Sequence, residues 1–182
     1  MGFDVYSLIN VAGFLFDLCR NCTWNRRITG VVLPEKCGKS TLCNSLTSQR
    51  VSLIDLDEII KSSSENADKL TRLKHKGEYS TITLLILKEA VELLDQIKQV
   101  HKYKRLVLIS SNTELLDALH IPKKCYVPSN TMSLEIASKL GEMKPVFENS
   151  RQTMIQNRAD VFNSYNELSS QIADRFHLSN KL

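Results

Sequence analysis

One stretch of sequence decides the fold: Ile28-Thr29-Gly30-Val31-Val32-Leu33-Pro34-Glu35-Lys36-Cys37-Gly38-Lys39-Ser40-Thr41. Its first six residues, 28–33, are mostly apolar and β-branched, which is typical of a buried strand. A polar loop follows, and a helix-like segment runs from Lys39 to about Ser48. A strand that leads through Gly-Lys-Ser-Thr into a helix is the context of a phosphate-binding loop.

The loop has the residue types that bind phosphate. Backbone N–H groups at the start of a helix point at an anion, and the helix dipole favours it. Gly38 lets the backbone approach closely, Lys39 would reach the outer phosphates, and Ser40 would ligate Mg²⁺. The predicted nucleotide-binding residues are Lys36, Cys37, Gly38, Lys39, Ser40 and Thr41. The alternative interpretation is an ordinary turn between a strand and a helix.

Two carboxylates follow the next predicted strand, Val51–Ile54, at Asp55 and Asp57. The carboxyl end of that strand lies at the same sheet edge as the loop, where open α/β sheets bind ligands. A carboxylate there can hold a metal ion or accept a proton from an attacking hydroxyl group. We expect Asp55 to position Mg²⁺ together with Ser40, and Asp57 to orient the acceptor. Alternatively, Asp57 only caps the helix that follows.

Strands and helices alternate along the rest of the chain. The expected elements are a polar stretch at 61–76, a helix at about 80–100, a strand at 105–109, a short helix at 114–119, a strand at 124–127, and two or three helices within 133–175. This alternation predicts a three-layer α/β/α fold with a parallel sheet of about five strands and helices on both faces. We expect residues 26–182 to form one domain.

Residues 1–25 are predicted to form a helical extension. Apolar side chains recur at spacings of three and four between Val5 and Cys19, which is the period of a helix. This stretch is shorter than the roughly 20 residues that a membrane-spanning helix needs, so we expect no membrane span. The helix either packs on its own domain or docks a second copy or a partner protein, because such a wide apolar face is costly to leave in water.

Composition limits the class of protein. The 182 residues are 42% hydrophobic and 24% charged, which excludes a disordered chain, a collagen-like repeat and a coiled-coil rod. A net charge of +4 is compatible with a local phosphate site and disfavours a nucleic-acid partner. The basic run 98–105 has only Tyr103 for base stacking, so we expect a solvated turn there. Five cysteines form no even set, which favours a reducing, cytoplasmic compartment.

Taken together, the strand, Gly-Lys-Ser-Thr, helix, strand and Asp-x-Asp resemble the small P-loop kinases. This family includes nucleoside monophosphate kinases and, most similar here, shikimate kinases. Gly77-Glu78 is similar to the Gly-Glu that precedes the family's long helix, and Lys144-Pro145-Val146 is similar to the Arg-Pro-Leu of its lid. The segment that begins at Arg158 is similar to the family's Arg and Tyr segment after the lid.

The resemblance implies ATP-dependent transfer of a phosphoryl group to a small acceptor that carries a hydroxyl or a phosphate, with ATP and Mg²⁺ as cofactors. Lys39, Ser40 and Asp55 match the family's phosphate and metal positions, and Asp57 and Arg158 match its acceptor contacts.

Two arginines near the predicted lid are further candidates. Arg151 and Arg158 are seven positions apart, so we expect them on one face of a helix. Arginines of a lid neutralise charge on the transferring group. The alternative is two exposed arginines on a surface helix.

The sequence also departs from the family pattern. Leu33 replaces the first glycine of G-x-x-x-x-G-K-[ST], a degenerate Walker A loop. Lys36 stands where many small kinases have a further glycine, and a non-glycine residue resists a positive φ by roughly 1–2 kcal/mol. The loop therefore either takes a different shape or binds phosphate weakly, or Lys36 compensates with its charge.

Other departures concern the acceptor. Ile82 stands where the shikimate family has an arginine for the acceptor carboxylate, and Ser110-Ser111-Asn112 replaces a glycine-rich run. Both argue against shikimate as the acceptor. The alternatives to a small-molecule kinase are a catalytically degenerate nucleotide-binding or assembly subunit and a kinase of 5′-hydroxyl polynucleotide ends. Cys37, beside the helix N-terminus and Lys39, is either a reactive thiol or a small loop residue without a role.

Overall fold

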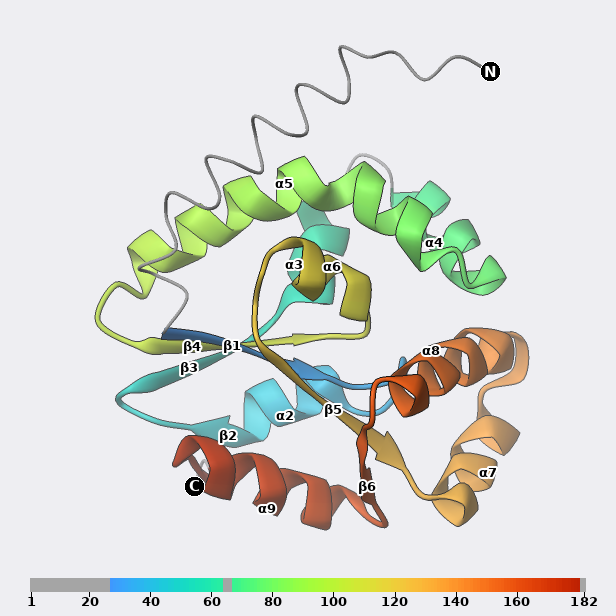
Figure 1. Ribbon diagram of the computed structural model, residues 1–182. Helices are drawn as coiled ribbons and strands as arrows, with labels where there is room; N and C mark the ends of the chain where they lie inside the picture. The colour runs from blue at the N-terminus through green and yellow to red at the C-terminus, as the bar shows by residue number, and fades with distance from the viewer. Residues whose placement is uncertain (1–26, 64–66, 181–182) are drawn as a thin grey trace, which may run out of the picture.

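We describe residues 27–63 and 67–180 of a computed structural model (Figure 1). The predicted extension at 1–25 lies outside these residues. No helix within the described ranges is both long enough and apolar enough to cross a membrane.

A five-stranded parallel sheet forms the centre of the structure, in the order β3-β4-β1-β5-β6. Its strands are β1 Ile28–Val32, β3 Val51–Asp55, β4 Arg105–Ser110, β5 Lys123–Pro128 and β6 Asp160–Phe162. In the register of the central pair, Ile28 lies opposite Leu106 and Val32 opposite Ser110. A separate antiparallel pair joins β2 Leu46–Thr47 to β7 Ser179–Asn180 near the end of the chain.

Helices cover both faces of the sheet, which confirms the predicted three-layer α/β/α fold (Figure 1). One face is covered by α3 Leu56–Ser63, α4 Ala67–Lys76, α5 Tyr79–Val100 and α6 Thr113–Ala118. The other is covered by α2 Lys39–Ser45, α7 Asn130–Lys139 and α9 Tyr165–Phe176. Helix α8 Lys144–Gln156 follows a short 3₁₀ turn, Gly141–Met143, and contributes side chains to both cores.

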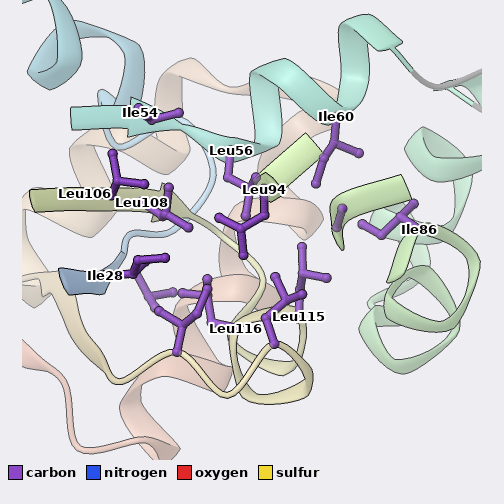
Figure 2. Close-up of a cluster of buried hydrophobic side chains, with 14 of the residues drawn as sticks. Ile28, Ile54, Leu56, Ile60, Ile86, Leu94, Leu106, Leu108, Leu115 and Leu116 are labelled. Carbon is purple, nitrogen blue, oxygen red and sulfur yellow. The ribbon is translucent and has the colours of Figure 1, made fainter. Parts of the chain in front are cut away.

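The central strands are mostly apolar because both of their faces are buried. In β1, Ile28 and Val32 face the core under α5 and α6, whereas Val31 faces the core under α2 and α9. Figure 2 shows the first of these cores, where Leu106 and Leu108 of β4 lie among leucines and isoleucines from the covering helices. The second core contains Phe147, Phe162 and Phe176, all nearly inaccessible to solvent.

The carboxyl ends of β1 and β4 lie side by side, and the loops that follow them lead to opposite faces of the sheet. Strand β1 leads into α2 on one face, and its neighbour β4 leads into α6 on the opposite face. In open α/β sheets, ligands bind in the crevice at such a switch point, outside the carboxyl ends of the strands. The 33–40 loop, which follows β1, lies at this edge.

The four strands that the sequence predicts at 28–33, 51–54, 105–109 and 124–127 are confirmed within about one residue. Two local expectations were wrong: the helix that starts at Lys39 ends at Ser45 rather than near Ser48, and β6 interrupts the predicted helical region 133–175. The polar stretch 61–76, for which the sequence analysis gave no secondary structure, consists largely of helix. Strand β6 has only three residues, too few to show a strand period in the sequence.

Candidate functional site

The 33–40 loop makes two left-handed turns before α2. Lys36 has a φ of 63° and Gly38 a φ of 77°. Lys36 therefore adopts the left-handed conformation that a glycine would adopt. The presence of lysine where many small kinases have a glycine does not prevent the turn. Gly38 is required for a second reason, because a Cβ atom there would lie 3.0 Å from the ring of Tyr165. The hydroxyl of Tyr165 also donates to the carbonyl of Lys36 at 3.4 Å, so α9 closes over the loop.

The side chain of Lys39 is buried between two carboxylates. Its Nζ lies 3.0 Å from Oε2 of Glu35 and 3.1 Å from Oδ2 of Asp57, and only 7% of the lysine is exposed. Burial alone would lower the pKa of Lys39, but the charges of Asp57 and Glu35 outweigh burial and hold the pKa above its ordinary value. Lys39 is therefore a fully charged cation at the sheet edge.

Asp57 is fixed by the end of the neighbouring strand β4. Ser110 donates its hydroxyl to Oδ1 at 2.6 Å, and Ser111 donates both its backbone N–H and its hydroxyl to Oδ2, at 2.8 and 2.6 Å. The hydroxyl of Ser111 also lies 2.7 Å from Oε1 of Glu35. These contacts tie the loop, α3 and β4 into one polar cluster.

The capping alternative for Asp57 is wrong. Helix α3 already begins at Leu56, and Oδ1 of Asp55 accepts from the backbone N–H of Glu58 at 3.2 Å. Asp55 therefore caps the first turn of α3, and Asp57 turns toward Lys39 instead.

Ser40 joins the loop to the other carboxylates of α3 and β3. Its hydroxyl lies 2.9 Å from Oδ2 of Asp55 and 3.2 Å from Oε2 of Glu58. Burial, and the nearby charge of Asp57, raise the pKa of Asp55, although Lys39 and the bond from Ser40 partly offset them. The ionised form of Asp55 is therefore disfavoured in this environment, and a bound cation would favour it.

The side-chain oxygen atoms of Ser40, Asp55 and Glu58 are suitable ligands for a hard cation. One hydroxyl and two carboxylates are the oxygen ligands that Mg²⁺ takes from proteins, with water and substrate phosphates completing its shell. No group of three or more His, Cys, Asp or Glu side chains that could hold a metal occurs in residues 27–63 and 67–180. The protein side chains would thus supply only part of the coordination.

Arg151 lies on α8, which packs beside the loop. The neighbouring Ser150 accepts the backbone N–H of Glu35 at 3.1 Å, and the charge of Arg151 acts on Cys37. The guanidinium itself donates to the carbonyl of Pro128 at 3.4 Å and to the side chain of Asn130 at 2.8 Å. It also lines a groove of about 450 Å³ between α7 and α8, whose other walls include Phe147 and Ser133.

Arg158 does not share a helix face with Arg151, so that prediction was wrong. Helix α8 ends at Gln156, and Arg158 follows in the left-handed region with a φ of 55°. Its N–H donates to Ile155, and the N–H of Ala159 donates to Met154, a pair of bonds that terminates the helix. The side chain is exposed, and no contact joins it to the cluster around Lys39 in the described structure.

Cys37 behaves as a structural residue. It is inaccessible to solvent, and burial raises the pKa of its thiol to about 12, although Lys39 nearby acts in the opposite direction. A thiol with so high a pKa is inert at neutral pH. The alternative of a loop residue without a chemical role is supported.

Several residues of the cluster were not singled out as site residues by the sequence analysis. They are Glu35, Glu58, Ser110, Ser111, Ser150 and Tyr165. A signal existed for Ser110 and Ser111, because they lie at the end of a predicted strand whose carboxyl end shares the sheet edge with that of β1. Glu35 carried no such signal, since a glutamate in a polar loop is normally solvated.

The fold and the site define an α/β protein with a compact polar cluster at the carboxyl edge of its sheet. No protein-family model matches the chain, and a comparison with curated proteins finds no similar sequence. The relation to small P-loop kinases therefore stays a prediction from the motifs.

Proposed function

We propose that the chain binds a nucleoside triphosphate, ATP, on the 33–40 loop and transfers its terminal phosphoryl group to a small acceptor that bears a hydroxyl or a phosphate. One observation carries the proposal: Lys39, Ser40, Asp55 and Asp57 come from three segments and meet within hydrogen-bond distance at the switch point of the sheet. A buried cation beside a hydroxyl and two carboxylates is the set of groups that phosphoryl transfer uses.

The start of α2 provides the donors for phosphate. Gly38 is the N-cap residue, and no side chain caps the helix. The N–H groups of its first turn therefore lack intrahelical acceptors and are available to an anion. Lys39 would hold the outer phosphates from the same side.

Ser40, Asp55 and Glu58 would hold Mg²⁺ against the phosphates. When bound, the ion neutralises charge on the transferring group. Asp57 already accepts from Ser110, Ser111 and Lys39, which stabilises its ionised form. Its proposed role is to orient Lys39 and the hydroxyl of the acceptor, and that of Arg151 is to neutralise charge on the side of the groove.

Glu35 favours a second candidate function. Its carboxylate lies 3.0 Å from Nζ of Lys39 and so takes the place beside the lysine that a phosphate would need. A nucleotide must displace this carboxylate and overcome its negative charge. If that cost is too high, the chain is a nucleotide-binding or assembly subunit that does not transfer phosphate.

Thermal unfolding of the full chain with Mg²⁺-ATP tests the binding step. Ligand at 100 times its Kd should stabilise the protein by about 2.7 kcal/mol, which raises the Tm by several degrees. We expect Lys39→Ala and Ser40→Ala to abolish this rise, and the exposed Lys139→Ala to leave it unchanged. Absence of any rise with the parent at millimolar Mg²⁺-ATP contradicts the proposal.

An acceptor screen that follows release of ADP separates the two candidates. Turnover that depends on both an acceptor and Lys39 supports the kinase. A Tm rise that requires Lys39, without turnover for any hydroxyl or phosphate acceptor, supports the binding subunit.

A further inference from the structure

The amino-terminal edge of the sheet, opposite the candidate site, is strongly basic. Three separate segments meet there: the start of β1, the turn between β2 and β3, and the turn between α5 and β4 (left side of Figure 1). These segments and the last turn of α5 carry six basic residues, here called the basic edge: Arg27, Arg50, Lys98, Lys102, Lys104 and Arg105.

Contacts between the segments bring them to the same end of the sheet. Arg27, Lys98, Lys102 and Lys104 line the same small depression with His101. The backbone N–H of Arg105 donates to the carbonyl of Arg50 at 2.9 Å, and its guanidinium donates to Thr29 at 3.2 Å. The first and third segments therefore adjoin, and the second lies directly beside the third.

The described segments that form this edge carry little negative charge. Residues 96–113, 27–29 and 47–52 contain no aspartate or glutamate. Of the basic edge, only Lys98 forms an ion pair with another described residue, Asp95 at 3.1 Å. Among the described residues, the remaining cations form no ion pair with an acidic side chain, so they repel one another unless an anion binds.

An exposed aromatic ring lies within the basic edge. Tyr103 is 85% exposed, and Nζ of Lys102 lies 4.9 Å from the centre of its ring. An exposed ring that a cation flanks is a platform on which an unpaired base stacks. A base within a duplex cannot reach such a platform, because both of its faces are already stacked.

We propose that the basic edge binds single-stranded nucleic acid, with the cations on the phosphates and a base on Tyr103. The basic run 98–105 alone predicted a solvated turn, but the fold places Arg27 beside it in the same depression and brings the backbone of Arg50 next to Arg105. Five residues of β1 separate this edge from the 33–40 loop, about 17 Å of extended chain, so the proposal is independent of the nucleotide site.

Fluorescence anisotropy of the full chain with a labelled 20-nucleotide uridine strand, titrated from 50 to 300 mM NaCl, tests the proposal. Binding should weaken steeply with salt. Lys102→Gln/Lys104→Gln should weaken it at least tenfold at 50 mM NaCl and reduce the salt slope by about 1.4, because each lost phosphate contact accounts for about 0.7. The matched control Lys69→Gln/Lys139→Gln removes the same charge elsewhere and should bind like the parent.

Tyr103 separates stacking from charge. Tyr103→Leu should weaken binding about fivefold or more at an unchanged salt slope, whereas Tyr103→Phe should bind like the parent. Excess Mg²⁺-ATP should not compete. The proposal is overturned if the parent does not bind the strand at 50 mM NaCl, or if the control variant loses as much affinity as the Lys102/Lys104 variant. Binding to vesicles with 30% phosphatidylserine but not to the strand also overturns it, in favour of a membrane surface.

Discussion

Lys39 of α2 and Asp57 of α3 form an ion pair, 3.1 Å between Nζ and Oδ2, that spans the carboxyl ends of β1 and β3. Strand β4 lies between these two strands, and its last residue, Ser110, together with the following Ser111, completes the cluster by donating to Asp57. Removal of Lys39 would leave both Asp57 and Glu35 without their cation, so this cluster contributes to stability.

Replacement of Lys39 tests that coupling. Lys39→Met should lower the free energy of unfolding by about 3 kcal/mol, because Glu35 and Asp57 would then be two adjacent buried carboxylates. Urea unfolding at pH 7 measures the change. The double variant Lys39→Met/Glu35→Gln should regain part of the loss, since one of the two charges is gone. A double variant no more stable than Lys39→Met would contradict this account.

Glu35 should oppose nucleotide binding. Glu35→Gln keeps the size and hydrogen-bonding ability of the side chain but removes a negative charge next to the proposed phosphate position. We expect Mg²⁺-ATP to bind roughly tenfold more tightly, which corresponds to about 1.4 kcal/mol, as measured by titration calorimetry. The control is Glu92→Gln on the outer surface of α5, which should leave the Kd unchanged. Equal or weaker binding by Glu35→Gln would show that this carboxylate is not the barrier.

The raised pKa of Asp55 predicts a pH dependence. Between the ordinary pKa of aspartate and the pKa of Asp55, the folded state binds more protons than the unfolded state, so the contribution of Asp55 to stability falls as pH rises. At pH 7 the ionised group costs stability, and Asp55→Asn should be more stable than the parent, because asparagine still caps α3. The difference should vanish toward pH 3, where the aspartate is neutral in both states. Urea unfolding at pH 3, 5 and 7 measures this difference, and a difference that stays constant with pH would contradict the assignment.

The two left-handed residues of the loop should respond in opposite directions. Gly38→Ala places a Cβ at a φ of 77° and 3.0 Å from the ring of Tyr165, so we expect a loss of about 1–2 kcal/mol in the free energy of unfolding. Lys36→Gly relieves a non-glycine residue at a φ of 63° and should cost nothing or stabilise slightly. Thermal unfolding of the two variants side by side measures both. Equal losses would show that loop strain is not what distinguishes these positions.

Much of the fold could be predicted from the sequence because its strands are short, apolar runs between helical patterns. The runs at 28–33 and 105–109 are mostly apolar, as expected where both faces of a strand are buried, and both became central strands. Strand β6 could not be predicted, because three residues show no period and β6 exists only through its pairing with β5. The end of α8 could not be predicted either, because Arg158 takes the left-handed position after the helix, where glycine is the usual signal.

The sequence by itself determined the four longer strands of the sheet and the place of Lys39 and Ser40 after β1, because these follow from local patterns and from residues adjacent in the chain. Only the tertiary structure decided which carboxylate meets Lys39, that Asp55 rather than Asp57 caps α3, and that Arg27 and Arg50 join the run 98–105. Each of these depends on which strand ends become neighbours in the sheet. That adjacency is set by packing between segments distant in sequence, and no local pattern encodes it.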